Sequence, residues 1–418
     1  MSDKVVKSDF YKNVLTLLTG TTIAQALPIA ISPILARMYS PEDFGVLALF
    51  VAITSIFAVI VNARYELAIV LPEKDEDAIN ILALGVLISI IFSLIILIVV
   101  IIFHNQILIL LDNKNISLWL YFIPLVVLLT GLYNVLNFYN TRIKNFKNIA
   151  ISSIYKSISM VIVQLIVGFF KTGASGLIIG RIVSFFSGNF GMLNVVVSDK
   201  ILMSKISKSG MKKMANRYID FPKFSLAGAL ANSMSIELSN VFMSSLFNIS
   251  TLGFYSFANN MLKMPGALIG KSISQVYFQE ANKERIEKGN AVKTFEGTVK
   301  KLFFISFPIF LLLFFFVEDI FAFVFSEKWR VAGQYAQILI PYIFVNFIVS
   351  PITITNSVFE KQKVSLIWQL GMLVLTLFVF WLAWTYSFEI KTLLYILTGI
   401  FTFYYLVFLL ILYRIAKG

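Results

Sequence analysis

Apolar stretches of about twenty residues recur along the whole chain, and this repetition constrains the fold more than any other feature of the sequence. A helix of about 20 apolar residues crosses the roughly 30 Å hydrocarbon core of a bilayer. Clear examples lie at 80–103 and 364–386. Because 58% of the residues are hydrophobic and only 14% are charged, the chain has too few charges to cover a soluble surface. The sequence therefore predicts an all-α polytopic membrane protein.

Hydropathy places the spans, and proline, glycine and charge mark their ends. We expect about twelve transmembrane helices, at 12–36, 44–69, 80–103, 116–139, 149–170, 174–197, 222–247, 252–278, 299–324, 331–358, 364–386 and 390–413.

The longest basic connection falls near the middle of the chain and separates six spans from six. We expect an N-lobe at 1–197, a cytoplasmic basic linker at 198–221 and a C-lobe at 222–418. Since each lobe has an even number of spans, both lobes begin on the same face of the membrane. A duplication would then give a parallel pseudo-twofold repeat about an axis along the membrane normal, with a substrate cavity between the lobes.

The charge distribution indicates the topology. The formal net charge is +13, from 35 Lys and Arg against 22 Asp and Glu, and the cations lie mostly in alternate connections between apolar segments. By the positive-inside rule, both termini are expected in the cytoplasm, and the polar start at 1–13 is interpreted as a retained tail. The cations do not form one basic face, so we expect no nucleic-acid partner.

Metal and nucleotide chemistry have little support in the sequence. There is no cysteine, and the single histidine, His104, has no cluster of candidate ligands around it, so no metal site and no cofactor are expected. The segment GALIGKS at 266–272 is one residue short of a P-loop and lies inside an apolar helix, so we expect no nucleotide partner.

Four cations inside predicted spans are the candidate substrate-binding residues: Arg64, Arg181, Lys263 and Lys271. A charge at the centre of a membrane helix costs about 2.5 to 3.5 kcal/mol, so each needs a partner, a wet cavity or a function. Lys263 and Lys271 are about 80° apart around one helix and share a face. Together the four predict a cationic cavity for an anion such as a diphosphate. For Lys271 the alternative is snorkelling to the interface, for Arg181 an interhelical hydrogen bond, and for Arg64 an interfacial anchor.

Carboxylates and prolines complete the set of candidates. Glu237, near mid-membrane, and Glu66, beside Arg64, are candidates for proton coupling or for charge pairing, and Glu237 could neutralise Lys263. In the first span, Gln25, Pro28 and Pro33 predict a bendable gate helix that lines the cavity.

The segments GTTIAQALPIAISPILARMYSPEDFGVLALF (20–50), RYELAIVLP (64–72) and LGFYSFANNMLKMPGALIGKSISQVYFQEA (252–281) resemble the Wzx-type O-antigen flippases of the polysaccharide biosynthesis family. The resemblance implies a MATE-like fold of the MOP superfamily in the bacterial inner membrane. It also implies a flippase that moves undecaprenyl-diphosphate-linked oligosaccharide repeat units to the periplasmic face by alternating access, for O-antigen or a related lipopolysaccharide or surface polysaccharide. Expected partners are membrane lipid, the polysaccharide polymerase and the chain-length regulator.

Three other functions stay open at this point. A lipid II flippase differs only in the head group of its substrate. A MATE-type small-molecule antiporter shares the fold but should carry an excess of carboxylates inside its lobes. A membrane-embedded polysaccharide polymerase needs a sizeable outer loop, whereas the expected outer connections are short, so we do not expect an enzyme.

Overall fold

The computed structural model describes the backbone of residues 2–418, and it describes all side chains in that range except those at 2–16, 18, 267 and 268. Within this range the chain is helical and forms no strand. It divides into two compact units, Met1–Ser245 and Leu246–Gly418. The expected division at 198–221 stays a prediction.

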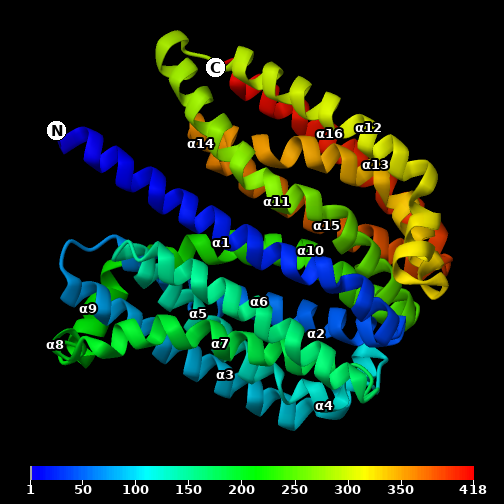
Figure 1. Ribbon diagram of the computed structural model, residues 1–418, viewed down its shortest axis with the longest axis horizontal. Helices are drawn as coiled ribbons and strands as arrows, with labels where there is room; N and C mark the ends of the chain where they lie inside the picture. The colour runs from blue at the N-terminus through cyan, green and yellow to red at the C-terminus, as the bar shows by residue number, and fades with distance from the viewer. Residues whose placement is uncertain (1) are drawn as a thin grey trace. The chain divides into compact units, whose positions relative to one another are not determined.

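The first unit contains ten α-helices and two short irregular helices in its described part (Figure 1). They are α1 (Ser2–Met38), α2 (Pro41–Ile60), η1 (Tyr65–Val70), α3 (Asp75–Leu111), α4 (Ser117–Leu120), α5 (Ile123–Arg142), α6 (Phe146–Phe169), α7 (Ser175–Ser198), α8 (Lys200–Met203), α9 (Lys208–Arg217), η2 (Phe221–Ser225) and α10 (Leu226–Leu246). The second unit contains α11 (Ile249–Lys288), α12 (Val292–Phe325), η3 (Glu327–Trp329), α13 (Arg330–Ile352), α14 (Thr355–Val358), α15 (Gln362–Tyr386) and α16 (Ile390–Ala416).

Ten helices of the described chain are long and apolar enough to cross a membrane. They correspond to ten of the expected spans, so the all-α polytopic class is confirmed. The remaining expected spans, 222–247 and 252–278, form α10 and α11 and are not among the ten. Polar residues lower the hydropathy of α10, and Lys263 and Lys271 lower that of α11.

The first helix runs through two prolines without ending. A proline cannot donate to the carbonyl four residues earlier, so Pro28 and Pro33 free the carbonyls of Ala24 and Ile29. The Ser157 hydroxyl on α6 donates to the Ala24 carbonyl at 2.6 Å, and the Ser32 hydroxyl donates to the Ile29 carbonyl at 2.7 Å. Both freed carbonyls are therefore satisfied by hydroxyl groups, as a helix surrounded by lipid requires.

The expected span 44–69 is interrupted. The helix α2 begins with a capping box at Ser40 and ends at Ile60, and a turn then leads into η1. The Asn62 amide holds this turn in the core: it donates to the Ser89 hydroxyl at 2.7 Å and to the carbonyls of Gly131 at 3.1 Å and Gly85 at 3.3 Å. One buried side chain thus joins the break to α3 and α5.

The expected linker is folded against the first unit. The Asn80 side chain of α3 accepts from the backbone of Ser207 at 3.0 Å and donates to the Lys205 carbonyl at 3.1 Å. The Tyr65 hydroxyl donates to the Ala215 carbonyl at 3.0 Å, and Met214 is fully buried in the core of the unit. The helix α9 is therefore a fixed element of the unit.

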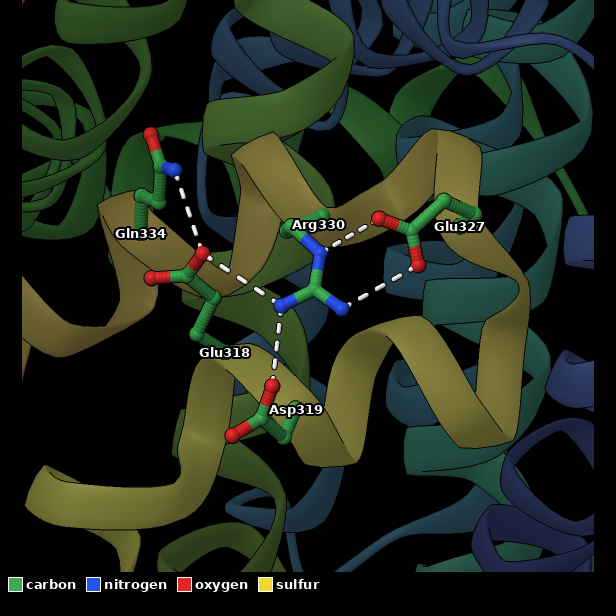
Figure 2. A network of polar contacts seen from close by, with 5 residues as sticks. All are labelled: Glu318, Asp319, Glu327, Arg330 and Gln334. Carbon is green, nitrogen blue, oxygen red and sulfur yellow. Dashed lines mark hydrogen bonds and ion pairs between the residues drawn. The ribbon is translucent and has the colours of Figure 1, made fainter.

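In the second unit, α13 packs against α11, α12 and α16 (Figure 1). A polar network fixes the junction between α12 and α13, as Figure 2 shows. Arg330 pairs with Asp319 at 2.8 Å, with Glu327 at 2.5 Å and with Glu318 at 3.5 Å, and the Gln334 amide donates to Glu318 at 3.2 Å. Trp329, next to Arg330 in the chain, is buried and packs against the rings of Phe254 and Phe257.

Candidate functional site

A stripe of small residues brings two spans of the first unit into close contact. Gly176, Gly180, Ser184 and Gly188 recur every four residues along α7, which is the spacing of membrane-helix interfaces. A Cβ atom added at Gly180 would lie 2.6 Å from Cγ of Gln164 and 2.9 Å from the Met160 carbonyl oxygen, both on α6. The two backbones are therefore as close as glycine permits.

This close packing places two cations of neighbouring helices in one cluster. The Lys156 ammonium on α6 lies 3.9 Å from the ring centroid of Phe185 and 4.3 Å from that of Tyr133. The Arg181 guanidinium on α7 lies 5.2 Å from the same Phe185 ring. Aromatic faces attract cations, so the rings stabilise both charges where water is scarce.

One carboxylate balances this pair. Glu237 on α10 stabilises the charge of Arg181, whereas Arg181 and Lys156 repel each other. The Asn240 amide donates to Oε2 of Glu237 at 3.1 Å and orients it. We call Lys156, Arg181, Glu237 and the rings of Tyr133 and Phe185 the cationic cluster. Two basic residues and one acidic residue give it a surplus of basic groups inside a membrane-spanning bundle.

An ion pair lies at the break after α2. The Arg64 guanidinium is 3.4 Å from Oε1 of Glu66, and its Nε donates to the Ser225 hydroxyl at 3.4 Å. Glu66 is only 4% exposed, and its Oε2 has no hydrogen-bond partner in the described part of the chain. Arg64 takes a left-handed backbone conformation with φ of 65°. The local break, and not the helix, therefore sets the direction of both side chains.

The two predicted lysines of α11 have different surroundings. The Lys263 ammonium lies 5.7 Å from the ring centroid of Tyr342 on α13, and the Tyr405 hydroxyl interacts with Tyr342 and Asn346. Lys271 is exposed. Lys263 thus belongs to a polar and aromatic group inside the second unit, and Lys271 does not.

The predicted gate residues lie along α1. Gln25 is exposed, and Pro28 and Pro33 are partly buried. Their role as a gate stays a prediction, as do the substrate-binding roles of the four cations. The single histidine has a packing role: its ring stacks on Tyr121, with 4.9 Å between centroids, and Nε2 is 3.0 Å from the Ser117 hydroxyl.

Lys156 was not among the residues predicted from the sequence. Its span, 149–170, also carries Ser153, Ser157 and Ser159, and a lysine on such a polar helix face is a signal that could have been used. The pairing of Glu237 with Arg181 was also not predicted, because it joins helices far apart in the sequence.

The comparisons with known proteins agree with this architecture. The family model for polysaccharide biosynthesis protein matches residues 34–334. A multidrug resistance MATE family transporter of the MOP superfamily, in an inward-facing conformation, superposes with a TM-score of 0.71 at 14% identity, covering 96% of this chain and 94% of that one. The lipid II flippase MurJ, in an inward closed conformation, superposes with a TM-score of 0.74 at 14% identity, covering 95% and 87%.

A MOP superfamily transporter from Pyrococcus furiosus also has this fold, with a TM-score of 0.59 at 13% identity over 96% of this chain and 95% of that one. No curated protein sequence matches the chain. At these identities the solved structures establish the fold, which is the MATE-like fold of the MOP superfamily. The family match spans most of the chain and confirms the resemblance seen in the sequence, so this chain is a membrane protein of the polysaccharide biosynthesis family.

Proposed function

We propose that this protein is a flippase that moves undecaprenyl-diphosphate-linked oligosaccharide repeat units from the cytoplasmic to the periplasmic face of a bacterial inner membrane. In this proposal it acts by alternating access, supplies repeat units for O-antigen or a related surface polysaccharide, and catalyses no covalent step. The observation that carries the proposal is the cationic cluster inside the first unit, where Lys156 and Arg181 share the Phe185 ring and Glu237 acts on Arg181.

The chemistry of such a substrate explains why a protein is needed. A hydroxyl or amide moved into hydrocarbon without a hydrogen bond costs about 4 to 8 kcal/mol, and a repeat unit carries many hydroxyls as well as a diphosphate. A wet, basic cavity open to the side would remove this cost while the polyprenyl tail stays in the bilayer. Energy would come from an ion gradient or from removal of the product.

In this proposal the cationic cluster receives the diphosphate. Charge-assisted hydrogen bonds to phosphate oxygens are about twice as strong as neutral ones, and the Arg181 guanidinium can make two of them in parallel. Glu237 holds Arg181 while the site is empty and competes with the diphosphate, so release stays possible. Further cationic contacts would come from Arg64, Lys263 and Lys271. Glu66 would act as a charge partner or proton carrier. The stretch of α1 with Gln25, Pro28 and Pro33 would act as the gate.

Lipid II is the second candidate substrate. The similarity to the fold of the lipid II flippase MurJ favours it, and its diphosphate would suit the same cations. The two substrates differ in the sugars that follow the diphosphate. A MATE-type antiporter for small organic cations is disfavoured, because the cluster would repel a cation.

The test is a deletion strain in which lipid-linked repeat units are located across the membrane. We expect them to accumulate on the cytoplasmic face and surface polysaccharide to be lost. The wild-type gene should restore polysaccharide, Arg181→Gln and Lys156→Gln should not, and Lys391→Gln, a change of an exposed lysine in α16, should restore it fully.

Protein level in the membrane is measured for each variant, and Lys156→Arg, which keeps the charge, should restore more polysaccharide than Lys156→Gln. Accumulation of lipid II with normal repeat-unit transport would favour the second candidate. Dye efflux together with unaltered surface polysaccharide would overturn both.

A further inference from the structure

The helix α9 and the segments beside it carry a concentration of positive charge on one fixed surface. Five lysines and one arginine at positions 200–217 lie exposed, namely Lys200, Lys205, Lys208, Lys212, Lys213 and Arg217.

Hydrogen bonds and packing hold this surface in place. Asn80 of α3 binds the backbone at both Lys205 and Ser207, and a Cβ atom added at Gly210 would lie 2.5 Å from Oδ1 of the Asn80 side chain. Met214 is fully buried on the opposite side of the helix. Because Asn80 lies in the second turn of the candidate span α3, α9 is fixed at one end of that span, beside its acidic first turn.

Four of the six cations remain available for a partner, and three of them lie on α9. Lys205 pairs with Glu76 at 3.3 Å and Arg217 pairs with Asp77 at 3.8 Å, so the acidic start of α3 neutralises the two flanks. Lys208, Lys212 and Lys213 lie on the outer face of α9 within about 140° of one another around the helix axis. Among residues with described side chains, none forms an ion pair with these three.

Apolar side chains accompany the charges. Ile201, seven residues before the start of α9, is 79% exposed, and Phe224, seven residues after its end, is 75% exposed. Exposed apolar groups next to a cationic helix face are typical of segments that lie in the headgroup layer, with the apolar groups directed to the acyl chains and the lysines to the phosphates. A soluble anion would not account for the apolar pair.

We infer that the outer face of α9, defined by Lys208, Lys212 and Lys213, binds anionic phospholipid headgroups of the adjoining leaflet, and that the exposed Ile201 and Phe224 on either side of α9 in the chain enter the same leaflet. The binding anchors the first unit at the membrane surface and is independent of the transport substrate. Each lysine near an anionic surface contributes a binding factor of about five at low salt, so loss of all three lowers affinity on the order of a hundredfold.

The experiment is native mass spectrometry of the purified full-length protein in detergent, titrated separately with phosphatidylglycerol and phosphatidylcholine. The wild type should retain phosphatidylglycerol preferentially, and salt should weaken that preference. The variant Lys208→Gln/Lys212→Gln/Lys213→Gln should lose the preference, and the corresponding triple arginine variant should keep it. The matched control is Lys300→Gln/Lys361→Gln/Lys363→Gln, which removes three exposed lysines of the second unit and should bind as the wild type does.

Three results would overturn the inference. They are equal retention of both lipids by the wild type, an unchanged preference in the glutamine variant, and an equal loss in the control variant. Inorganic phosphate that bound with the same lysine dependence, without any preference between the lipids, would assign the surface to a soluble anion. If the glutamine variant does not fold, the arginine variant and the salt dependence of the wild type still decide between these outcomes.

Discussion

Replacing Gly180 by alanine tests the packing that assembles the cationic cluster. The added Cβ would lie 2.6 Å from Cγ of Gln164 and 2.9 Å from the Met160 carbonyl oxygen. The Gln164 side chain can rotate away, but the carbonyl belongs to the backbone of α6 and cannot. The helix α7 must therefore move away from α6, and Arg181, the next residue in the chain, moves with it.

The expected cost follows from two opposing effects. Overpacking of a filled interface costs about 1 to 3 kcal/mol, whereas alanine is favoured over glycine inside a helix by up to about 1 kcal/mol. The net destabilisation is up to about 2 kcal/mol, which lowers the unfolding midpoint of a unit of this size by up to roughly 8 °C. Substrate transport should fall by more than this stability loss explains, because the spacing between Lys156 and Arg181 changes.

The assay combines thermal unfolding of the purified protein with complementation of the deletion strain. The matched control is Gly399→Ala in α16, where an added Cβ would meet no atom within 4 Å. That variant should unfold at or above the wild-type temperature and complement fully. If Gly180→Ala behaved like Gly399→Ala in both assays, the close approach of α6 and α7 could not be what positions the cluster.

Three further changes test other parts of the structure. Asn62→Leu removes three buried hydrogen bonds at the break after α2 and should destabilise the protein by roughly 2 kcal/mol or more, measured as a lower unfolding midpoint; an unchanged midpoint would contradict the role of this amide. Ser157→Ala leaves the Ala24 carbonyl without its hydroxyl donor and should destabilise the protein by about 1 kcal/mol, whereas Ser157→Thr, which keeps a hydroxyl, should destabilise it less. Equal unfolding midpoints for the two variants would contradict the role of this hydrogen bond. Burial alone would raise the pKa of Glu284, but hydrogen bonds from Thr294 at the start of α12 overcome this and hold that pKa below its ordinary value. The stability gained from this carboxylate is therefore complete at neutral pH and is lost as the pH falls below about 4.5. Glu284→Gln should destabilise the protein by about 1 kcal/mol at pH 7 and by less in acid. A difference in stability between the wild type and this variant that grew in acid would contradict a lowered pKa for Glu284.

The spans could be predicted wherever a local property decides them. The expected span 174–197 matches α7, Ser175–Ser198, almost residue by residue, because length and hydropathy are read from the segment itself. The interruption after Ile60 could not be predicted in the same way. It depends on the Asn62 amide reaching Gly85 and Gly131, which are distant in the sequence.

In the candidate site, too, local features of the sequence could be predicted and contacts between distant residues could not. Arg181 stood out because a charge inside an apolar segment is conspicuous in any sequence. Lys156 did not, because its role appears only when the small residues of α7 pack against α6 and place the Phe185 ring over its ammonium group. Likewise, nothing local in the sequence joins Glu237 of α10 to Arg181 of α7.

Binding of undecaprenyl diphosphate to the purified protein tests the central claim most directly. A charge-assisted hydrogen bond is worth about 1.5 to 3 kcal/mol, so Lys156→Gln and Arg181→Gln should each weaken binding by roughly ten- to a hundredfold. The double variant should weaken it less than the product of the two, because both residues contact one diphosphate. Unchanged affinity in the double variant, with the protein folded, would contradict the proposal that the cationic cluster holds the diphosphate.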